Sequence, residues 1–188
     1  EQIEAFAETS ASAYGVSKRA ANEYAASLGG IFNASGLAKD EAAEFSVQAI
    51  QLAADLGSLR NLGVDEALEK IRSGLVGEAE PLRTVGVLLS EAAVQAKAAE
   101  LGLGSLNGEL TEGEKVRARF AIITEQLNVA ENNFANTLGE SLPNQAKVAR
   151  AELENAAATL GEKLLPLAIT ATEAVTTLVT AFTALPES

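Results

Sequence analysis

Apolar side chains recur every three or four residues over long runs, and this spacing constrains the fold more than any other feature of the chain. The clearest run consists of Val116, Phe120, Ile123, Leu127, Ala130, Phe134 and Leu138. A second run consists of Phe45, Ala49, Leu52, Leu56 and Leu59. Because an α-helix has ~3.6 residues per turn, each run lies along one helix face. No run alternates with period two for long enough to indicate a strand, so we expect an all-α fold.

The composition supports the same fold class. The chain is 47% hydrophobic but only 4% aromatic, so alanine supplies much of its apolar content. Alanine is the best helix former and permits close helix packing. A chain of 188 residues can form one domain, or one domain plus an extension. We expect a compact multi-helix domain over residues 1–138, followed by an extended amphipathic segment over residues 139–188 that forms a long helix or helical hairpin.

Glycine and capping residues indicate where the first helices begin and end. A short helix is expected over residues 1–14, before Gly15. Ser17 can cap a second helix that runs to Leu28 and ends at Gly29 and Gly30. Further helices are predicted over residues 39–60, 65–71, 81–101 and 111–138. Thr111 and Glu114 have the spacing of a capping box, and residues 141–143 begin the next helix.

The stretch from residue 72 to 91 reads as a sharp helix-to-helix corner. Ser73 and Gly74 are expected to end the incoming helix, because glycine accepts the left-handed conformation found at helix ends. Gly77 allows a second reversal, and Pro81 suits the first turn of the outgoing helix, where its missing N–H costs nothing.

Three charged residues accompany this corner. Glu78 and Glu80 lie before or within the first turn of the outgoing helix, where the helix dipole favours negative charge. Arg83 is within reach of either carboxylate. These residues predict a corner held by a salt bridge, since neither a nucleophile nor a proton shuttle lies beside the carboxylates.

The C-terminal segment carries a continuous apolar stripe. The stripe comprises Ala149, Leu153, Ala156, Leu160, Leu164, Leu167, Ala171, Ala174, Leu178, Ala181 and Leu185. This spacing is typical of a helix that packs against a partner along its whole length, with Gly161 and Pro166 as points where it kinks or breaks. Residues 164–185 contain one charge, Glu173, but also six threonines. An amphipathic partner-binding helix and a membrane-inserting segment both remain open for this stretch.

Residues that commonly carry chemistry are scarce. The chain has no cysteine and no histidine, which removes thiol chemistry, the usual general base and the commonest metal ligand. A net charge of −12 disfavours binding to nucleic-acid backbones and to anionic membrane surfaces. The basic cluster of Lys115, Arg117 and Arg119 is expected to pair with nearby acidic residues, namely Glu109, Glu112 and Glu114. We therefore expect no enzyme activity, no cofactor, no metal and no direct nucleic-acid binding.

The corner also carries a resemblance to a known family. Residues 73–91, SGLVGEAEPLRTVGVLLSE, resemble the signature S-G-L-x-G-E-x-E-P-L-R-x-x-G-V-x-L-x-E of phage and prophage tail tape measure proteins. The residues that match it are Ser73, Gly74, Gly77, Glu78, Glu80, Pro81, Arg83 and Gly86. Stretches beginning at Tyr14, Ala53, Leu110 and Phe134 agree, so the resemblance spans about residues 10–150. Ala38, where a Ser or Thr helix cap is expected, is one departure.

The resemblance implies a structural role. A tape measure protein sets the length of the tail tube, whose subunits polymerise around it with the help of assembly chaperones. The expected partners are therefore the tail tube protein, tail assembly chaperones and further copies of the chain. The expected location is the lumen of the virion tail tube, and the host cytoplasm during assembly. Because methionine is absent, even at position 1, we expect an internal fragment of a longer protein. The alternative is a membrane-active segment, residues 164–185, that helps DNA cross the host envelope.

Overall fold

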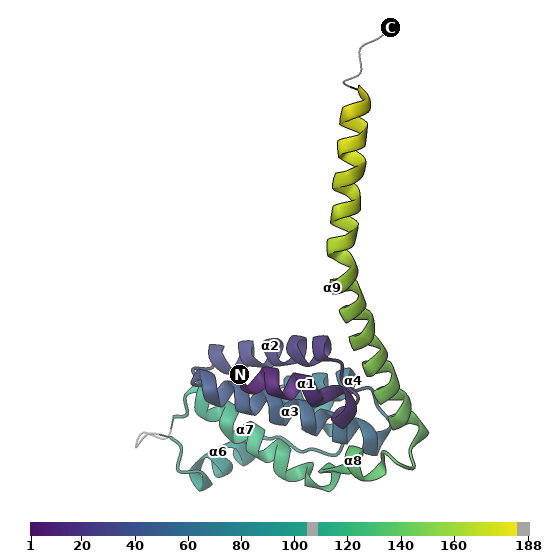
Figure 1. Ribbon diagram of the computed structural model, residues 1–188. Coiled ribbons are helices and arrows are strands. Elements are labelled where there is room, and N and C mark those ends of the chain that lie inside the picture. Colours follow the sequence, from purple (N-terminus) through teal and green to yellow (C-terminus); the bar gives the residue numbers. More distant parts are fainter. Residues whose placement is uncertain (105–108, 184–188) are drawn as a thin grey trace. The chain divides into compact units, whose positions relative to one another are not determined.

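A computed structural model describes residues 1–104 and 109–183 of the chain, and in these ranges it contains helices and no strand, which confirms the all-α class. The elements, shown in Figure 1, are α1 (Gln2–Tyr14), α2 (Lys18–Ala34), α3 (Lys39–Arg60), α4 (Val64–Leu75), α5 (Glu80–Arg83), α6 (Glu91–Glu100), α7 (Glu112–Gln126), the 3-10 helix η1 (Asn128–Ala130), α8 (Asn133–Thr137) and α9 (Leu142–Thr183).

The chain divides into two units, residues 1–152 and 153–188. The first unit extends beyond residue 138, where the sequence placed the end of the compact domain. It does so because the first turns of α9 belong to it: Asn144 and Ala151 are both buried. The described part of the second unit is the remainder of α9, a helix that includes Gly161 and Pro166.

The glycine and capping residues predicted the boundaries of the first two helices only in part. Gly15 ends α1 in the left-handed conformation, with φ 65°, and the Ser17 hydroxyl accepts the Ala20 N–H at the start of α2, as predicted. The predicted stop at Gly29 and Gly30 is wrong, because α2 continues to Ala34. The apolar face decides this, since continuing the helix carries Phe32 into the interior, where its side chain is completely buried.

Helix α3 is the centre of the first unit and packs against α1, α2, α4 and α8. The predicted single stripe is too narrow, because Ile50, Ala53 and Ala54 are fully buried in addition to Ala49 and Leu56. A helix surrounded by four others needs small side chains where the neighbours approach closely. The alanines of α3 meet this need, which explains why an alanine-rich, aromatic-poor chain can build a dense core.

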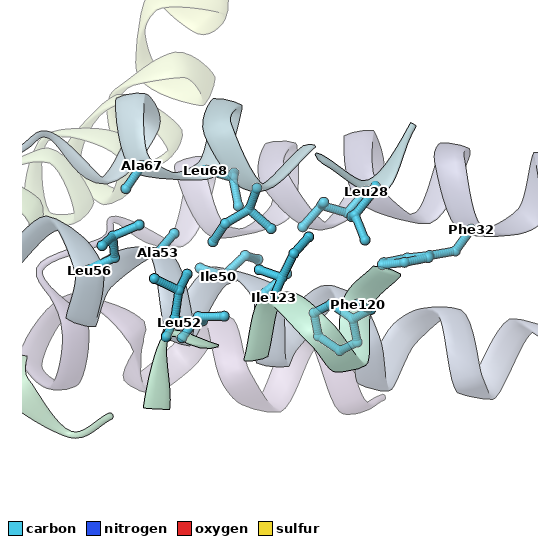
Figure 2. Packing of buried hydrophobic residues seen from close by; sticks show 14 of the residues in the cluster. Leu28, Phe32, Ile50, Leu52, Ala53, Leu56, Ala67, Leu68, Phe120 and Ile123 are labelled. Atoms are coloured by element: carbon cyan, nitrogen blue, oxygen red, sulfur yellow. The ribbon is translucent and has the colours of Figure 1, made fainter. Parts of the chain in front are cut away.

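The core is a layer of side chains between α2, α3, α4 and α7 (Figure 2). The labelled residues point toward one another from these four helices: Leu28, Phe32, Ile50, Leu52, Ala53, Leu56, Ala67, Leu68, Phe120 and Ile123. At one end, Phe45 brings its ring centroid to 5.6 Å from that of Phe32 and 4.7 Å from that of Phe120. Each large side chain buried here contributes about 1.5–3 kcal/mol to stability.

The predicted helix over residues 111–138 is interrupted. Its start is confirmed, because Thr111 and Glu114 form the capping box. Its continuity is wrong, since α7 ends at Gln126 and is followed by η1 and α8. The break covers residues 127–132 and ends at Asn132, which adopts a left-handed conformation with φ 59° just before α8. The predicted stripe still faces inward, because its members are buried from Val116 to Phe134.

Candidate functional site at the signature corner

The corner begins later than the sequence predicts. Helix α4 passes through Ser73 and Gly74 and ends at Leu75. The left-handed residue is Gly77, with φ 99°. The N–H of Gly77 donates to the Gly74 carbonyl at 3.0 Å, and the N–H of Glu78 donates to the Ser73 carbonyl at 2.8 Å. Gly77 therefore does what the sequence assigned to Gly74: it reverses the chain and satisfies the last carbonyls of the helix.

Gly74 has a different role, which is packing. A Cβ atom built on it would lie 2.2 Å from Leu82 Cδ1 and 3.0 Å from Ile123 Cδ1. Leu82 is fully buried and anchors α5 beneath α4, so any larger residue at position 74 would push α5 or α7 outward. The glycine is thus required by close approach and not by backbone conformation.

The chain after Pro81 is not the long helix that the sequence predicts. Pro81 does lie in the first turn of a helix, but α5 ends at Arg83 and α6 begins only at Glu91. Between them Val85, Val87 and Leu89 are buried, while Gly86 and Leu88 are exposed. Residues 84–86 form a turn, in which Gly86 has φ 91°. In the following residues 87–90, Val87 and Leu89 face inward and Leu88 faces outward, the alternation of an extended backbone.

The extended segment is held by one side chain of α7. Gln126 accepts the Leu88 N–H at 2.8 Å and donates to the Leu88 carbonyl at 2.9 Å. A side-chain amide thereby supplies both hydrogen bonds that a neighbouring strand would supply. Arg60 adds a bond to the Val85 carbonyl at 3.3 Å.

The charged residues of the corner lie on the outside. Arg83 donates to Glu80 at 2.9 Å, as predicted, but the two side chains are 58% and 81% exposed. Glu78 is exposed as well. Exposed ion pairs contribute about 0–1 kcal/mol. The glycines and apolar residues therefore hold the corner, and its charged residues lie at the surface.

A second polar cluster lies at the C-terminal end of α3, where α8 and the start of α9 attach. Asp55 accepts the N–H groups of Asn132 and Phe134, each at 2.9 Å. These bonds cap the start of α8 from another helix, because Asn132 makes no side-chain cap of its own. Burial raises the pKa of the Asp55 carboxyl, and the two N–H bonds oppose that rise.

The first turn of α9 is fixed by Asn144, whose side chain is only 2% exposed. Its amide nitrogen donates to the hydroxyl oxygens of Ser58 at 2.7 Å and Thr137 at 2.9 Å. The Ser58 hydroxyl in turn donates to the Asn133 side chain at 2.7 Å. One hydrogen-bonded network therefore joins α3, α8 and α9.

One turn further along α9, Lys147 caps the end of α3. Its ammonium donates to the Leu62 carbonyl at 3.0 Å and to the Gly57 carbonyl at 3.5 Å. A cation at this end of a helix also complements the helix dipole. Burial lowers the pKa of Lys147. Gly15 makes the close approach possible, since a Cβ atom there would lie 2.8 Å from Lys147 Cβ.

The basic cluster at the start of α7 is engaged within the first unit. Lys115 pairs with Glu112 at 2.7 Å, as predicted. Arg117 instead binds Glu41 of α3 through two bonds of 2.5 and 2.6 Å, which hold the pKa of that carboxyl below its usual value. Arg119 donates to the Leu75 carbonyl at the end of α4. The expected pairing with Glu109, Glu112 and Glu114 is thus confirmed for one cation, and the other two join helices.

An open groove lies between α3, α6 and α7. Its floor is apolar and includes Phe45, Leu103 and Phe120. On its rim, Lys97 bridges Glu100 and Glu125, at 2.7 Å from each. Residues 1–104 and 109–183 contain no group of three or more His, Cys, Asp or Glu residues able to hold a metal ion. In the same ranges, no helix combines the length and the hydropathy that crossing a membrane requires.

Comparison of the chain with protein-family models, curated proteins and solved structures gives no match. The relation to tape measure proteins therefore stays a prediction based on the residues of the signature and its neighbours.

The sequence reasoning missed the residues that attach α8 and α9. A signal for Asp55 was present, because it is the one charged residue between Phe45 and Leu59. Asn144 and Lys147 gave no such signal, since they lie at the start of a helix among other polar residues. Their partners are as far as ninety residues away along the chain.

Proposed function

We propose that the chain is a structural, non-enzymatic segment of a phage tail tape measure protein that sets tail tube length and supports tail assembly. The support is the resemblance of residues 73–91 to the family signature and an all-α fold. In this role the chain would associate with copies of itself and meet the tail tube protein and tail assembly chaperones. It would occupy the host cytoplasm during assembly and the tube lumen in the virion.

The observation that carries the proposal is the apolar surface of α9. Among the described side chains of α9 after residue 152, five large apolar ones are more than half exposed, namely Leu153, Leu160, Leu164, Leu165 and Ile169. Proteins that act as monomers rarely leave such a row in contact with water. Leu153, Leu160 and Leu164 belong to the stripe that the sequence predicts. Side-by-side packing of several copies would cover it, as a bundled tape requires.

The first test is the solution mass, measured by light scattering together with small-angle X-ray scattering. We expect an elongated assembly heavier than the 19.4 kDa chain. Leu160→Lys should reduce it to a monomer, and Thr159→Lys, at the neighbouring exposed position off the stripe, should leave it intact. A wild-type monomer with a radius of gyration near ~16 Å at every concentration would contradict self-association. Dye release from lipid vesicles by that monomer would favour the membrane-active alternative.

The second test addresses tube length directly. In a phage that carries this chain in its tail, duplication of residues 153–183 should lengthen the tube, because each added helical residue extends the tape by ~1.5 Å. Electron microscopy of tails measures the effect. Tails of unchanged length would contradict the ruler role even if the chain self-associates.

A further inference from the structure

We infer that residues 128–152 form a separately opening part of the first unit, in which η1, α8 and the first turns of α9 detach from α3 while the hydrophobic core of α1–α7 stays packed. The inference rests on the packing of the first unit and is independent of what the chain assembles with. It concerns a conformational change that neither the fold nor the proposed function requires.

The hydrophobic core is complete without these residues. The main cluster of buried apolar side chains runs from Phe6 to Leu127 and includes no residue of α8 or α9. Ala130, Phe134 and Ala151 are buried outside it. Removing residues 128–152 from α3 would therefore uncover one large apolar side chain, Phe134, and two alanines, while the labelled residues of the layer in Figure 2 all lie outside this segment.

The attachment is instead polar and concentrated at one end of α3. Asp55 holds the start of α8, and Ser58 holds Asn144 and Asn133. Lys147 binds carbonyls at the end of the same helix. The leucines on either side of these turns, Leu142 and Leu153, are 76% and 71% exposed and contribute nothing to the attachment.

Water can replace these contacts in a way that it cannot replace core packing. A hydroxyl, an amide, an ammonium or a carbonyl that is uncovered by opening finds water as its new partner, so the net loss is small. An uncovered leucine of the core finds no such replacement. Opening of residues 128–152 therefore requires less free energy than unfolding of the whole unit, which is the condition for an independent opening unit.

The backbone has a joint at the place where opening would begin. Helix α7 ends at Gln126, and Asn132 adopts a left-handed φ of 59°, a conformation that breaks the helix and that asparagine accepts more readily than most residues. The two N–H groups that Asp55 accepts lie immediately around this residue. Release of Asp55 would let Asn132 relax, so loss of the bonds and movement of the backbone are coupled.

Hydrogen–deuterium exchange of the whole chain, followed by mass spectrometry, tests the inference. We expect the amides of residues 128–141 to exchange at least tenfold faster than those of residues 45–57 in α3, and urea to accelerate their exchange less steeply, because their opening exposes less surface than global unfolding. Asn144→Ala combined with Lys147→Met should accelerate exchange over residues 128–141 by a further tenfold and leave residues 45–57 as they were. Arg150→Ala, an exposed change on the same turns of α9, serves as the matched control and should alter neither.

Two results would overturn the inference. In the first, both segments of the wild-type chain exchange at the same rate and with the same urea dependence, which means that they open only by global unfolding. In the second, the double variant accelerates both segments equally. If the double variant does not fold, the exchange rates and urea dependence of the two segments in the wild-type chain alone test the inference.

Discussion

Helix α3 is held in two ways along its length, and the comparison separates what gives the fold its stability from what gives it its connections. In its middle, Ala49, Ile50 and Ala53 are fully buried in the apolar core shared with α2, α4 and α7. At its C-terminal end, Asp55 and Ser58 bind α8 and α9 through directed hydrogen bonds. Water cannot replace the apolar contacts of the first region. The polar groups of the second region can form hydrogen bonds with water instead of with each other.

The two regions differ in magnitude as well. A fully buried large apolar side chain contributes about 1.5–3 kcal/mol, while one hydrogen bond contributes a net of about 0.5–1.5 kcal/mol. Hydrogen bonds, however, fix angle and register. We infer that the apolar middle of α3 supplies stability, and that its polar end selects where α8 and α9 begin.

The largest effect is expected in the apolar region, from Phe32→Ala. Phe32 is fully buried and its ring contacts those of Phe45 and Phe120. Truncation should lower the free energy of unfolding by about 3–5 kcal/mol, the lost burial plus the cavity. Urea unfolding followed by circular dichroism measures it. Phe32→Leu should cost less, and a loss below about 1 kcal/mol for Phe32→Ala would show that the ring layer is not the stabilising region.

The next effect belongs to the polar end, through Asp55→Ala. The change leaves the Asn132 and Phe134 N–H groups without an acceptor, and the latter is buried. We expect a loss of about 1–3 kcal/mol in the free energy of unfolding at neutral pH. Asp55→Asn keeps one acceptor and should lose less. Equal stability of wild type and Asp55→Ala would mean that the contrast between the two regions of α3 is wrong.

The pH dependence of the Asp55 contribution follows from its raised pKa. The folded-state pKa lies above the unfolded value near 3.8, so the folded protein binds the proton more readily. The wild-type advantage over Asp55→Ala should therefore be greatest below pH 3.8 and should decline as the pH rises through the folded-state pKa. Urea titrations of both proteins across this window measure the difference.

The apolar region was the part that the sequence could predict. Spacing of three and four residues located the buried side chains from Val116 to Phe134 correctly, even though the helix is broken after Gln126. For α3 it found Ala49, Leu52 and Leu56 but missed Ile50, Ala53 and Ala54, and it included the exposed Leu59. Periodicity reports which side chains face inward, and this survives a local break because the core surrounds both sides of it. It does not report whether a helix is continuous. That depends on distant contacts, such as the hydrogen bonds that Asp55 accepts from the backbone of Asn132 and Phe134.

Three glycines that the sequence reads as helix ends lie inside helices. Gly74 lies within α4 because Leu82 and Ile123 leave no room for a Cβ atom. Gly29 and Gly30 lie within α2, and nothing in the structure explains them, because no atom of another element lies within 4 Å of a Cβ built at either position. By contrast, Gly15 and Gly77 adopt positive φ values and end or reverse the chain as glycine commonly does. Nothing local separates Gly74 from these two glycines, since its deciding contacts come from residues that are up to fifty positions away.

A smaller effect is expected where two helices of the core are joined by charge, at Glu41 and Arg117. The pair is bidentate, but both side chains are about 30% exposed, so Glu41→Gln should cost about 1 kcal/mol or less. The Arg117 hydrogen bond lowers the folded-state pKa of Glu41 below its usual 4.5. The stabilisation is therefore present above pH 4.5 and lost as the pH falls through the folded-state pKa. Its sign is opposite to that of Asp55, on the same helix.

The pH profiles of the Glu41 and Asp55 variants provide a matched pair. The difference between wild type and Glu41→Gln should shrink on acidification, whereas that between wild type and Asp55→Ala should grow. If both stability differences changed in the same direction with pH, the more exposed Glu41 and the buried Asp55 would not have pKa values shifted in opposite directions. The contrast between these two polar contacts would then be wrong.

The smallest effect is expected at the signature corner, from Arg83→Ala. If the salt bridge that the sequence predicts between Arg83 and Glu78 or Glu80 held the corner, this change would lower the melting temperature. Because both side chains are exposed, we expect Arg83→Ala to lower the free energy of unfolding by only about 0.5 kcal/mol or less. Gly74→Leu, which would drive a side chain into Leu82 and Ile123, should destabilise the unit far more.

Thermal unfolding of these two corner variants, with Glu78→Gln as a surface control, separates architecture from recognition. A melting temperature of Arg83→Ala within ~2 °C of wild type, together with impaired tail assembly, would assign Glu80 and Arg83 to partner binding. The glycines and apolar residues would then be the architecture beneath them. A large loss of stability for Arg83→Ala would instead make the exposed pair part of the fold, and the corner would join the polar end of α3 as a region held by charge.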